Sequence, residues 1–128
     1  MNTKRNAVGW FEIPVANMDR AIAFYQGLLD VTLSRNTMGP LDMAWFPFDG
    51  DAPGSSGSLV KHEAYVPSEH GALLYFTSPS GDIANEESNI EALGGTLLQG
   101  KKLIAEDYGY MLLFKDTEGN RIALHSRN

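Results

Sequence analysis

The chain has 128 residues, of which 43% are hydrophobic and 20% charged, a balance typical of one folded domain and not of a disordered segment. It has no cysteine, which excludes disulfides, thiolate metal sites and thiol catalysis, and its net charge of −6 disfavours nucleic-acid binding. No apolar run reaches the length of a membrane span, and residues 1–6 lead into no signal-peptide core. We therefore expect one cytoplasmic domain, residues 1–128, with neither nucleic acid nor membrane as partner.

The first half of the chain predicts a strand, a helix and three more strands. Residues 8–15 are rich in aromatic and β-branched side chains, as strands are. Asn17 is a candidate helix N-cap, and apolar residues recur at three- and four-residue spacing from there to Leu29, which predicts a helix with one buried face. Three further strands are expected at residues 31–37, 43–48 and 58–62.

The second half repeats this order after a loop at residues 63–71. A strand is expected first, then a helix ended by two glycines, then three strands, at residues 72–77, 82–93, 96–104, 108–115 and 121–126. Sliding the sequence by 63 residues (73 minus 10) places Trp10 on Leu73 and His62 on His125, so the first and last strands of both halves align. We interpret the chain as two βαβββ modules, residues 7–63 and 71–127.

Two such modules, packed side by side, predict an α+β fold with one curved mixed sheet and the helices outside. The concave face of that sheet would form a cleft, which is where a small molecule would bind.

Three parts of the chain also carry recognisable patterns: FEIPV at 11–15 with MDRAIAFY at 18–25, EALGG at 91–95, and FKDTEGNRIAL at 114–124. As a set they resemble the vicinal oxygen chelate superfamily of glyoxalases, bleomycin resistance proteins and extradiol dioxygenases, in particular its glyoxalase-like branch. The resemblance covers nearly the whole chain and implies the two-module fold and a homodimer. Members isomerise substrates, open rings or displace epoxides with a metal, whereas the bleomycin resistance members bind a drug without chemistry.

The resemblance also implies where a metal would be held. Each module of that superfamily typically supplies histidine or glutamate ligands from its first and its last strand. In this sequence those positions fall on Trp10, Leu73, Val60 and Ala123, with Leu59 or Lys61 in place of Val60 if the strand register differs by one. Because zinc, nickel and iron need imidazole, carboxylate or thiolate ligands, we predict no metal cofactor.

Alternation along the strands predicts which side chains face the cleft. Together they form an aromatic wall with a few polar groups, as in many ligand sites: Trp10, Glu12, Trp45, His62, Tyr75, Arg121 and His125. Within this set Glu12 is the candidate catalytic base or ligand anchor. The alternative interpretation is a paired carboxylate on a solvated sheet face.

Three functions stay open from the sequence. The first is a glyoxalase-like protein that binds a small organic molecule without the family's metal. The second is a divalent-metal-dependent lyase, isomerase or dioxygenase-like enzyme that uses Glu12, His62 and His125, although both histidines are also typical of surface positions at strand ends. The third is a regulatory or drug-binding resistance module, whose aromatic cleft is a contact surface.

Overall fold

The computed structural model describes residues 5–128, and in this range the chain forms eight strands and two helices. In chain order they are β1 (Phe11–Pro14), α1 (Met18–Leu29), β2 (Ser34–Met38), β3 (Leu41–Trp45), β4 (Gly57–Lys61), β5 (Leu74–Thr77), α2 (Ile83–Glu87), β6 (Thr96–Ala105), β7 (Gly109–Lys115) and β8 (Arg121–Ser126). Neither helix in this range has the length and hydrophobicity that crossing a membrane requires.

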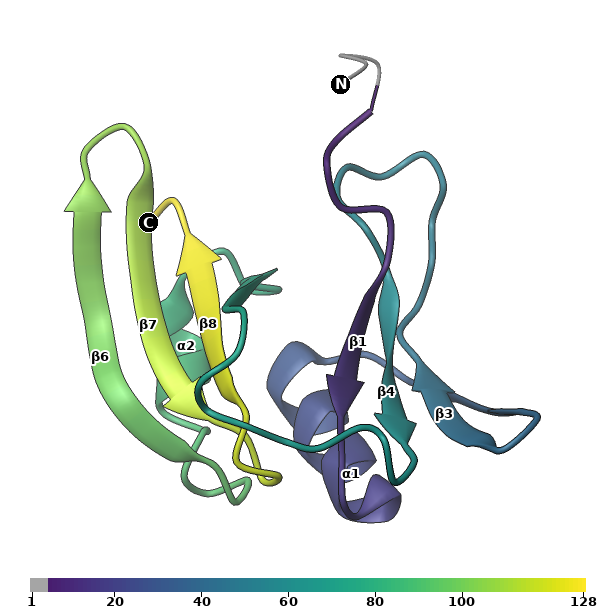
Figure 1. Cartoon of the computed structure of the whole chain (residues 1–128). Helices are drawn as coiled ribbons and strands as arrows, with labels where there is room; N and C mark the ends of the chain where they lie inside the picture. Colours follow the sequence, from purple (N-terminus) through teal and green to yellow (C-terminus); the bar gives the residue numbers. More distant parts are fainter. Residues whose placement is uncertain (1–4) are drawn as a thin grey trace.

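The strands form two four-stranded sheets with the same topology. Their orders are β1-β4-β3-β2 and β5-β8-β7-β6, and in each sheet the first strand pairs in parallel with the fourth while the other pairs are antiparallel. Figure 1 shows the two sheets side by side with α1 and α2 behind them. The predicted α+β fold of two βαβββ modules is confirmed.

The relation between the halves follows the spacing seen in the sequence. Adding 63 to the bounds of β1 gives residues 74–77, the bounds of β5. In place of one continuous curved sheet, however, the described residues form two sheets, and β1 and β5 lie at their edges without pairing to each other. The edges of the two sheets therefore remain separate at the centre of the molecule.

Helix α1 packs on both halves. Its N-cap is Asn17, whose side chain accepts a hydrogen bond from the Arg20 amide at 3.0 Å, and it ends at Asp30 in a left-handed conformation. Its buried face shares one core with side chains from both sheets, and the rings of Phe24 and Phe114 lie 5.8 Å apart. Burial of this face explains why the two modules form one body.

Helix α2 is shorter than the predicted range of 82–93. It ends at Glu87 because the side chains of Ser88 and Asn89 both donate to the Asn85 carbonyl, at 2.8 and 3.3 Å. A continuing α-helix would use the Asn89 amide for that carbonyl, but this amide donates to Glu86 instead. The expected apolar side of this segment is nevertheless present, since Ile83 and Ile90 are fully buried.

The turn between β7 and β8 joins the second module to the first. Asp116 is buried and accepts the hydroxyl of Tyr25 at 2.5 Å, the Glu118 amide at 2.9 Å and the Asn120 amide at 3.0 Å. The Asn120 side chain donates in turn to the carbonyl of Pro14 at 2.8 Å. These bonds hold the end of β1 and the body of α1 against the second sheet.

Candidate functional site

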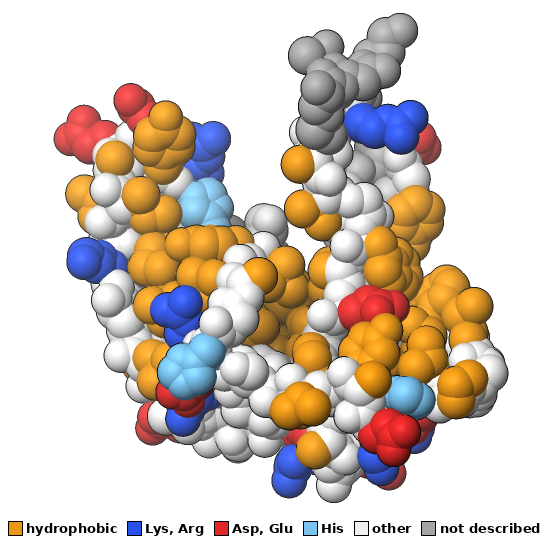
Figure 2. Space-filling view, in the orientation of Figure 1, with side chains coloured by type: hydrophobic (Ala, Val, Ile, Leu, Met, Phe, Trp, Pro, Cys, Tyr) orange, Lys and Arg blue, Asp and Glu red, His pale blue; other side chains and the backbone are white. Residues whose placement is uncertain are grey.

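The unpaired edges of β1 and β5 are bordered by two cavities, which we call the upper and the lower cavity. The upper cavity has a volume of about 570 Å³ and the lower one about 430 Å³. Phe11 and Leu74, one from each edge strand, line both of them. Figure 2 shows the molecule hollowed between its two halves, with hydrophobic side chains on both sides of the hollow.

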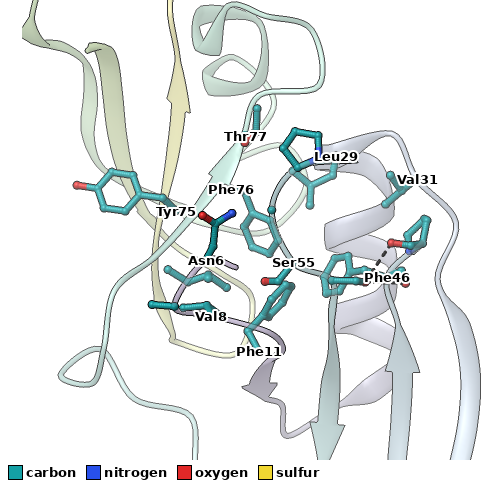
Figure 3. Close-up of a pocket in the computed structure, with 16 residues that line it drawn as sticks. Asn6, Val8, Phe11, Leu29, Val31, Phe46, Ser55, Tyr75, Phe76 and Thr77 are labelled. Atoms are coloured by element: carbon teal, nitrogen blue, oxygen red, sulfur yellow. Dashed lines mark hydrogen bonds between the residues drawn. The ribbon is translucent and has the colours of Figure 1, made fainter. Parts of the chain in front are cut away.

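Three phenylalanines form the floor of the upper cavity. Phe11 of β1, Phe46 after β3 and Phe76 of β5 lie in mutual contact, each pair of ring centroids 5.5 Å apart. In Figure 3 Leu29 and Val31, at the end of α1, extend this apolar wall. The floor is thus built by both modules, because each supplies at least one ring.

Polar groups also line the upper cavity. Asn6, Ser55 and Thr77 line it, and the loop that carries Ser55 is held by the neighbouring Ser56 hydroxyl, which contacts the Phe46 carbonyl at 3.1 Å. Tyr75 also lines this cavity, but its side chain extends away from the phenylalanine floor (Figure 3) and is 49% exposed. Such a cavity favours an apolar molecule with one or two polar substituents.

The lower cavity contains the two charged residues that were predicted to face the cleft. Glu12 of β1 and Arg121 of β8 both line it, together with apolar side chains that include Val66 and Leu73. The Glu12 carboxylate accepts a hydrogen bond from the Tyr65 hydroxyl at 2.8 Å. This bond, followed by burial and the carboxylate charge, raises the pKa of Tyr65, so the phenol remains a donor at neutral pH.

The two predicted tryptophans contact each other on the face of the first sheet that points away from α1. The Trp10 and Trp45 rings meet edge to face with centroids 5.2 Å apart. Neither residue lines the upper or the lower cavity. Of the residues predicted as one cleft, Glu12, Tyr75 and Arg121 thus line the two cavities, the tryptophans form a separate pair, and His62 and His125 lie outside both groups.

The two predicted histidines make backbone contacts: His62 also packs on the ring of Tyr65, with centroids 6.2 Å apart. His62 accepts the Ala64 amide on its Nδ1 atom at 3.1 Å, and Nε2 of His125 is hydrogen-bonded to the Tyr108 carbonyl. Throughout residues 5–128, no three histidine, cysteine, aspartate or glutamate side chains form a group that could hold a metal ion. The structure thus does not bring Glu12, His62 and His125 together as one set of three metal ligands.

The positions to which the resemblance assigns the family's metal ligands hold side chains that do not fit a metal. Val60 and Ala123 are fully buried aliphatic residues in the fourth strand of each sheet, and Trp10 and Leu73 offer indole and alkyl groups. Val60 pairs with Pro14 and Met43, whereas the neighbouring Lys61 is exposed. Side chains without a lone-pair donor cannot replace imidazole or carboxylate ligands.

Sequence reasoning missed the phenylalanine floor. Successive side chains of a strand point to opposite faces, so Phe11 lies on the face opposite to Trp10 and Glu12. If the ligand contacts only the concave face, Phe11 is expected in the core. The separation of β1 from β5 opens the upper cavity toward Phe11, Phe46 and Phe76 instead. The signal available in the sequence was their aromatic character alone, which core packing also explains.

Comparison with known proteins agrees with this architecture. The Glyoxalase/Bleomycin resistance protein/Dioxygenase superfamily profile matches residues 7–124. No curated protein matches the sequence at a significant level.

Solved structures share the fold at low sequence identity. A glyoxylase/bleomycin resistance protein/dioxygenase domain from Frankia sp. EAN1pec has a TM-score of 0.72 at 18% identity, covering 95% of this chain and 98% of that one. The antibiotic binding protein TnmS3 from Streptomyces sp. CB03234 has a TM-score of 0.66 at 19% sequence identity, and the match covers 99% of this chain and 100% of that one. The fosfomycin resistance protein FosX from Listeria monocytogenes has a TM-score of 0.70 at 14% sequence identity, and the match covers 98% of this chain and 92% of that one. Through the profile match over nearly its whole length, this chain belongs to the Glyoxalase/Bleomycin resistance protein/Dioxygenase superfamily.

Proposed function

We propose that this protein binds a small, mainly apolar organic molecule in the upper cavity between β1 and β5. One observation carries the proposal: a cavity of about 570 Å³ with a floor of three phenylalanines and a few polar lining groups. Pockets that hold small molecules typically span roughly 300–1,000 Å³ and combine apolar walls with a few polar groups. An aromatic ligand of two or three rings fits this description.

The structural neighbours support a binding role in particular. One of them is an antibiotic binding protein and another a fosfomycin resistance protein. We therefore propose aromatic antibiotics as the first ligand class to examine, with a drug-binding or resistance role as the corresponding biological function.

Binding in the upper cavity needs no metal in this proposal. The cavity is lined by apolar, hydroxyl and amide groups, and none of its lining residues is a histidine, aspartate or glutamate. The ligand would be held by contact with the rings and by hydrogen bonds at Asn6, Ser55 or Thr77.

The remaining predicted residues are proposed as secondary contacts. Glu12 and Arg121 would bind polar substituents that reach the lower cavity, since both line it. Ligand contacts of His62 and His125 stay predictions, as does a catalytic role of Glu12 in a lyase or isomerase reaction. A cytoplasmic location also stays a prediction.

A thermal-shift screen of aromatic antibiotics, thiol conjugates, sugars and divalent metals tests the proposal, because a ligand that binds only the folded state raises the melting temperature. Ser55→Phe places a phenyl ring in the upper cavity, which Ser55 lines, and should abolish the shift given by the best organic ligand. Ala52→Phe is the matched control, an exposed residue of the same loop outside the cavity lining. An equal shift in Ser55→Phe would contradict binding in the upper cavity.

We further propose that the protein is a homodimer. The edge strands β1 and β5 keep unpaired backbone groups, which a second copy can use. Apolar side chains such as Tyr75 and Val66 are exposed near these edges. Light scattering should give the mass of two chains at micromolar concentration, and a clean monomer would contradict this assembly.

A further inference from the structure

A third cavity lies beyond the ends of β1 and β4, and we call it the basal cavity. It has a volume of about 770 Å³. The two strands run in the same direction, and Figure 1 shows them ending side by side at the bottom of the view. The lining comes from residues 15–16 after β1, residues 40 and 42 at the turn between β2 and β3, and residues 61–63 and 65–67 at and after the end of β4.

The basal cavity is separate from the two cavities between the sheets. It shares no lining residue with the upper cavity and only Val66 with the lower one. Asp42 and Lys61 pair in the β3–β4 ladder and therefore point to one face of the first sheet. That face carries α1, because Arg35, which binds Asp42, also binds Asp19 in the first turn of this helix. The charged wall of the basal cavity is thus on the opposite side of the sheet from the tryptophan pair.

Two neighbouring residues of the basal cavity can donate hydrogen bonds to a ligand. Lys61 brings an exposed ammonium group, which forms no ion pair within residues 5–128. His62 accepts the Ala64 amide on Nδ1 at 3.1 Å, so its neutral ring carries the proton on Nε2 and donates from there. Two donors of which one is charged favour a carboxylate as their partner.

Of the two carboxylates that line the basal cavity, Glu63 is the better acceptor for a ligand. Asp42 accepts from Arg35 on both of its oxygens, each at 2.8 Å, and these bonds lower its pKa. Glu63 is exposed and forms no ion pair in the described part of the chain. Its position is fixed by a turn, since the Tyr65 amide donates to the His62 carbonyl at 2.9 Å. A ligand with an ammonium group would therefore bind Glu63.

Apolar side chains beside these charged groups are held in place. Pro40 and Pro67 line the cavity with rings of fixed backbone conformation. The Tyr65 ring meets the His62 ring edge to face with centroids 6.2 Å apart, and its hydroxyl donates to Glu12 at 2.8 Å. Because this wall is already ordered, a hydrophobic group loses little free energy in ordering it on binding.

We propose that the basal cavity binds a small amphoteric molecule with an apolar body, of the class of the hydrophobic amino acids. The carboxylate of the ligand contacts Lys61 and His62, its ammonium group contacts Glu63, and its side chain packs on Pro40 and Tyr65. A cation, a neutral donor and a carboxylate are supplied here by three consecutive residues that line one cavity. This site goes beyond the proposed function and uses no residue of the upper cavity.

Three related probes separate the two charges of such a ligand. They are L-phenylalanine, 3-phenylpropanoate, which lacks the ammonium group, and 2-phenylethylamine, which lacks the carboxylate. A titration followed in ¹⁵N–¹H spectra should move the backbone amide signals of Lys61, Ala64 and Val66. L-Phenylalanine should bind about threefold more tightly than either analogue, because each analogue loses one partly exposed ion pair.

Two variants give the sharper test, because each should affect a different pair of probes. Lys61→Gln should weaken binding of L-phenylalanine and 3-phenylpropanoate about threefold without weakening that of 2-phenylethylamine. Glu63→Gln should weaken binding of L-phenylalanine and 2-phenylethylamine about threefold without weakening that of 3-phenylpropanoate. The matched controls are Lys102→Gln and Glu106→Gln, which change exposed residues of the second module outside the cavity lining and should bind all three probes as the wild type does.

Unmoved amide signals at millimolar L-phenylalanine would overturn the proposal. It would also be overturned if Lys61→Gln and Glu63→Gln weakened all three probes alike, or no more than the controls do. The proposed function is tested separately, since Ser55→Phe blocks the upper cavity and should leave the binding of L-phenylalanine unchanged. Loss of this binding in Ser55→Phe would assign L-phenylalanine to the upper cavity and contradict the basal site.

Discussion

Arg20 of α1 and Glu118 of the turn before β8 form a two-point ion pair across 98 residues of sequence, with contacts of 2.8 and 3.1 Å. The same carboxylate accepts the backbone amides of Ala16 and Asn17, each at 2.8 Å. A negative charge at the start of a helix is favoured by the exposed amides and the helix dipole. Glu118 thus binds the first turn of α1 from the other module and helps to set the separation between β1 and β5.

Glu118→Gln should destabilise the protein in a pH-dependent way. Burial raises the pKa of Glu118, but hydrogen bonds from Arg20, from the Asn17 amide, from Thr117 and from the Ala16 amide outweigh it and hold this pKa at about 2, below the ordinary 4.5. A lowered pKa stabilises the fold fully above pH 4.5 and progressively less as the pH falls toward 2. The glutamine variant should lose about 3 kcal/mol at pH 7.

Urea unfolding at pH 7, 4 and 3 measures this difference. The difference in free energy of unfolding between wild type and Glu118→Gln should become smaller as the pH falls. A difference that does not depend on pH would contradict the account. The control is Glu106→Gln, since Glu106 is exposed at the β6–β7 turn. Its stability should stay within about 0.5 kcal/mol of wild type.

Tyr25→Phe tests the second bond between the modules. The Tyr25 ring is fully buried, and burial together with the Asp116 charge raises the pKa of its hydroxyl well above 10, so it donates at every physiological pH. Its loss leaves Asp116 with fewer donors in a buried position, and we expect a cost of about 1–3 kcal/mol. Tyr65→Phe, which removes a bond to the exposed Glu12, should cost much less in the same urea titration.

Gly57→Ala should disrupt the pairing of β1 with β4. A Cβ atom at this position would lie 2.3 Å from the Phe11 carbonyl oxygen, a backbone atom that cannot move without shifting β1. We expect a loss of at least about 2 kcal/mol and weaker ligand binding, because Phe11 also forms the floor of the upper cavity. Gly9→Ala, where a Cβ meets nothing within 4 Å, should be close to neutral in thermal unfolding.

Metal content provides a further prediction. Purified protein should contain zinc, nickel, iron and manganese far below one ion per chain, and a chelator should leave its melting temperature unchanged, because the family's ligand positions hold indole and aliphatic groups. One tightly bound ion per chain, detected by elemental analysis, would contradict this expectation. Glu12→Ala would then show whether Glu12 takes part in binding it.

The repeat and the fold were accessible from the sequence because their signals are local. The 63-residue spacing predicts β5 from β1, and the spacing of apolar residues predicts α1. The end of α2 was not accessible, since it depends on two polar side chains competing for one carbonyl, that of Asn85. The apolar spacing that includes Ile83 and Ile90 continues into the turns that follow the helix. A helix predicted from this spacing is therefore too long.

Of the residues predicted to face one cleft, Tyr75 lines the upper cavity, whereas Glu12 and Arg121 line the lower one. Alternation identified Glu12 and Arg121, which do line one cavity together, and Trp10 with Trp45, which do make contact. It could not show that the two sheets remain unpaired at β1 and β5, because that depends on packing between residues far apart in the chain. The phenylalanine floor follows from this separation alone.

The most direct test of the central claim is the position of a bound ligand. Intermolecular nuclear Overhauser effects should be recorded between the best organic ligand of the thermal-shift screen and the methyl groups of the protein. Binding in the upper cavity predicts contacts with Leu29, Val31 and Leu74, all of which line it. Contacts confined to methyl groups outside the cavity, such as Leu103 and Ile104 at the exposed end of β6, would contradict it.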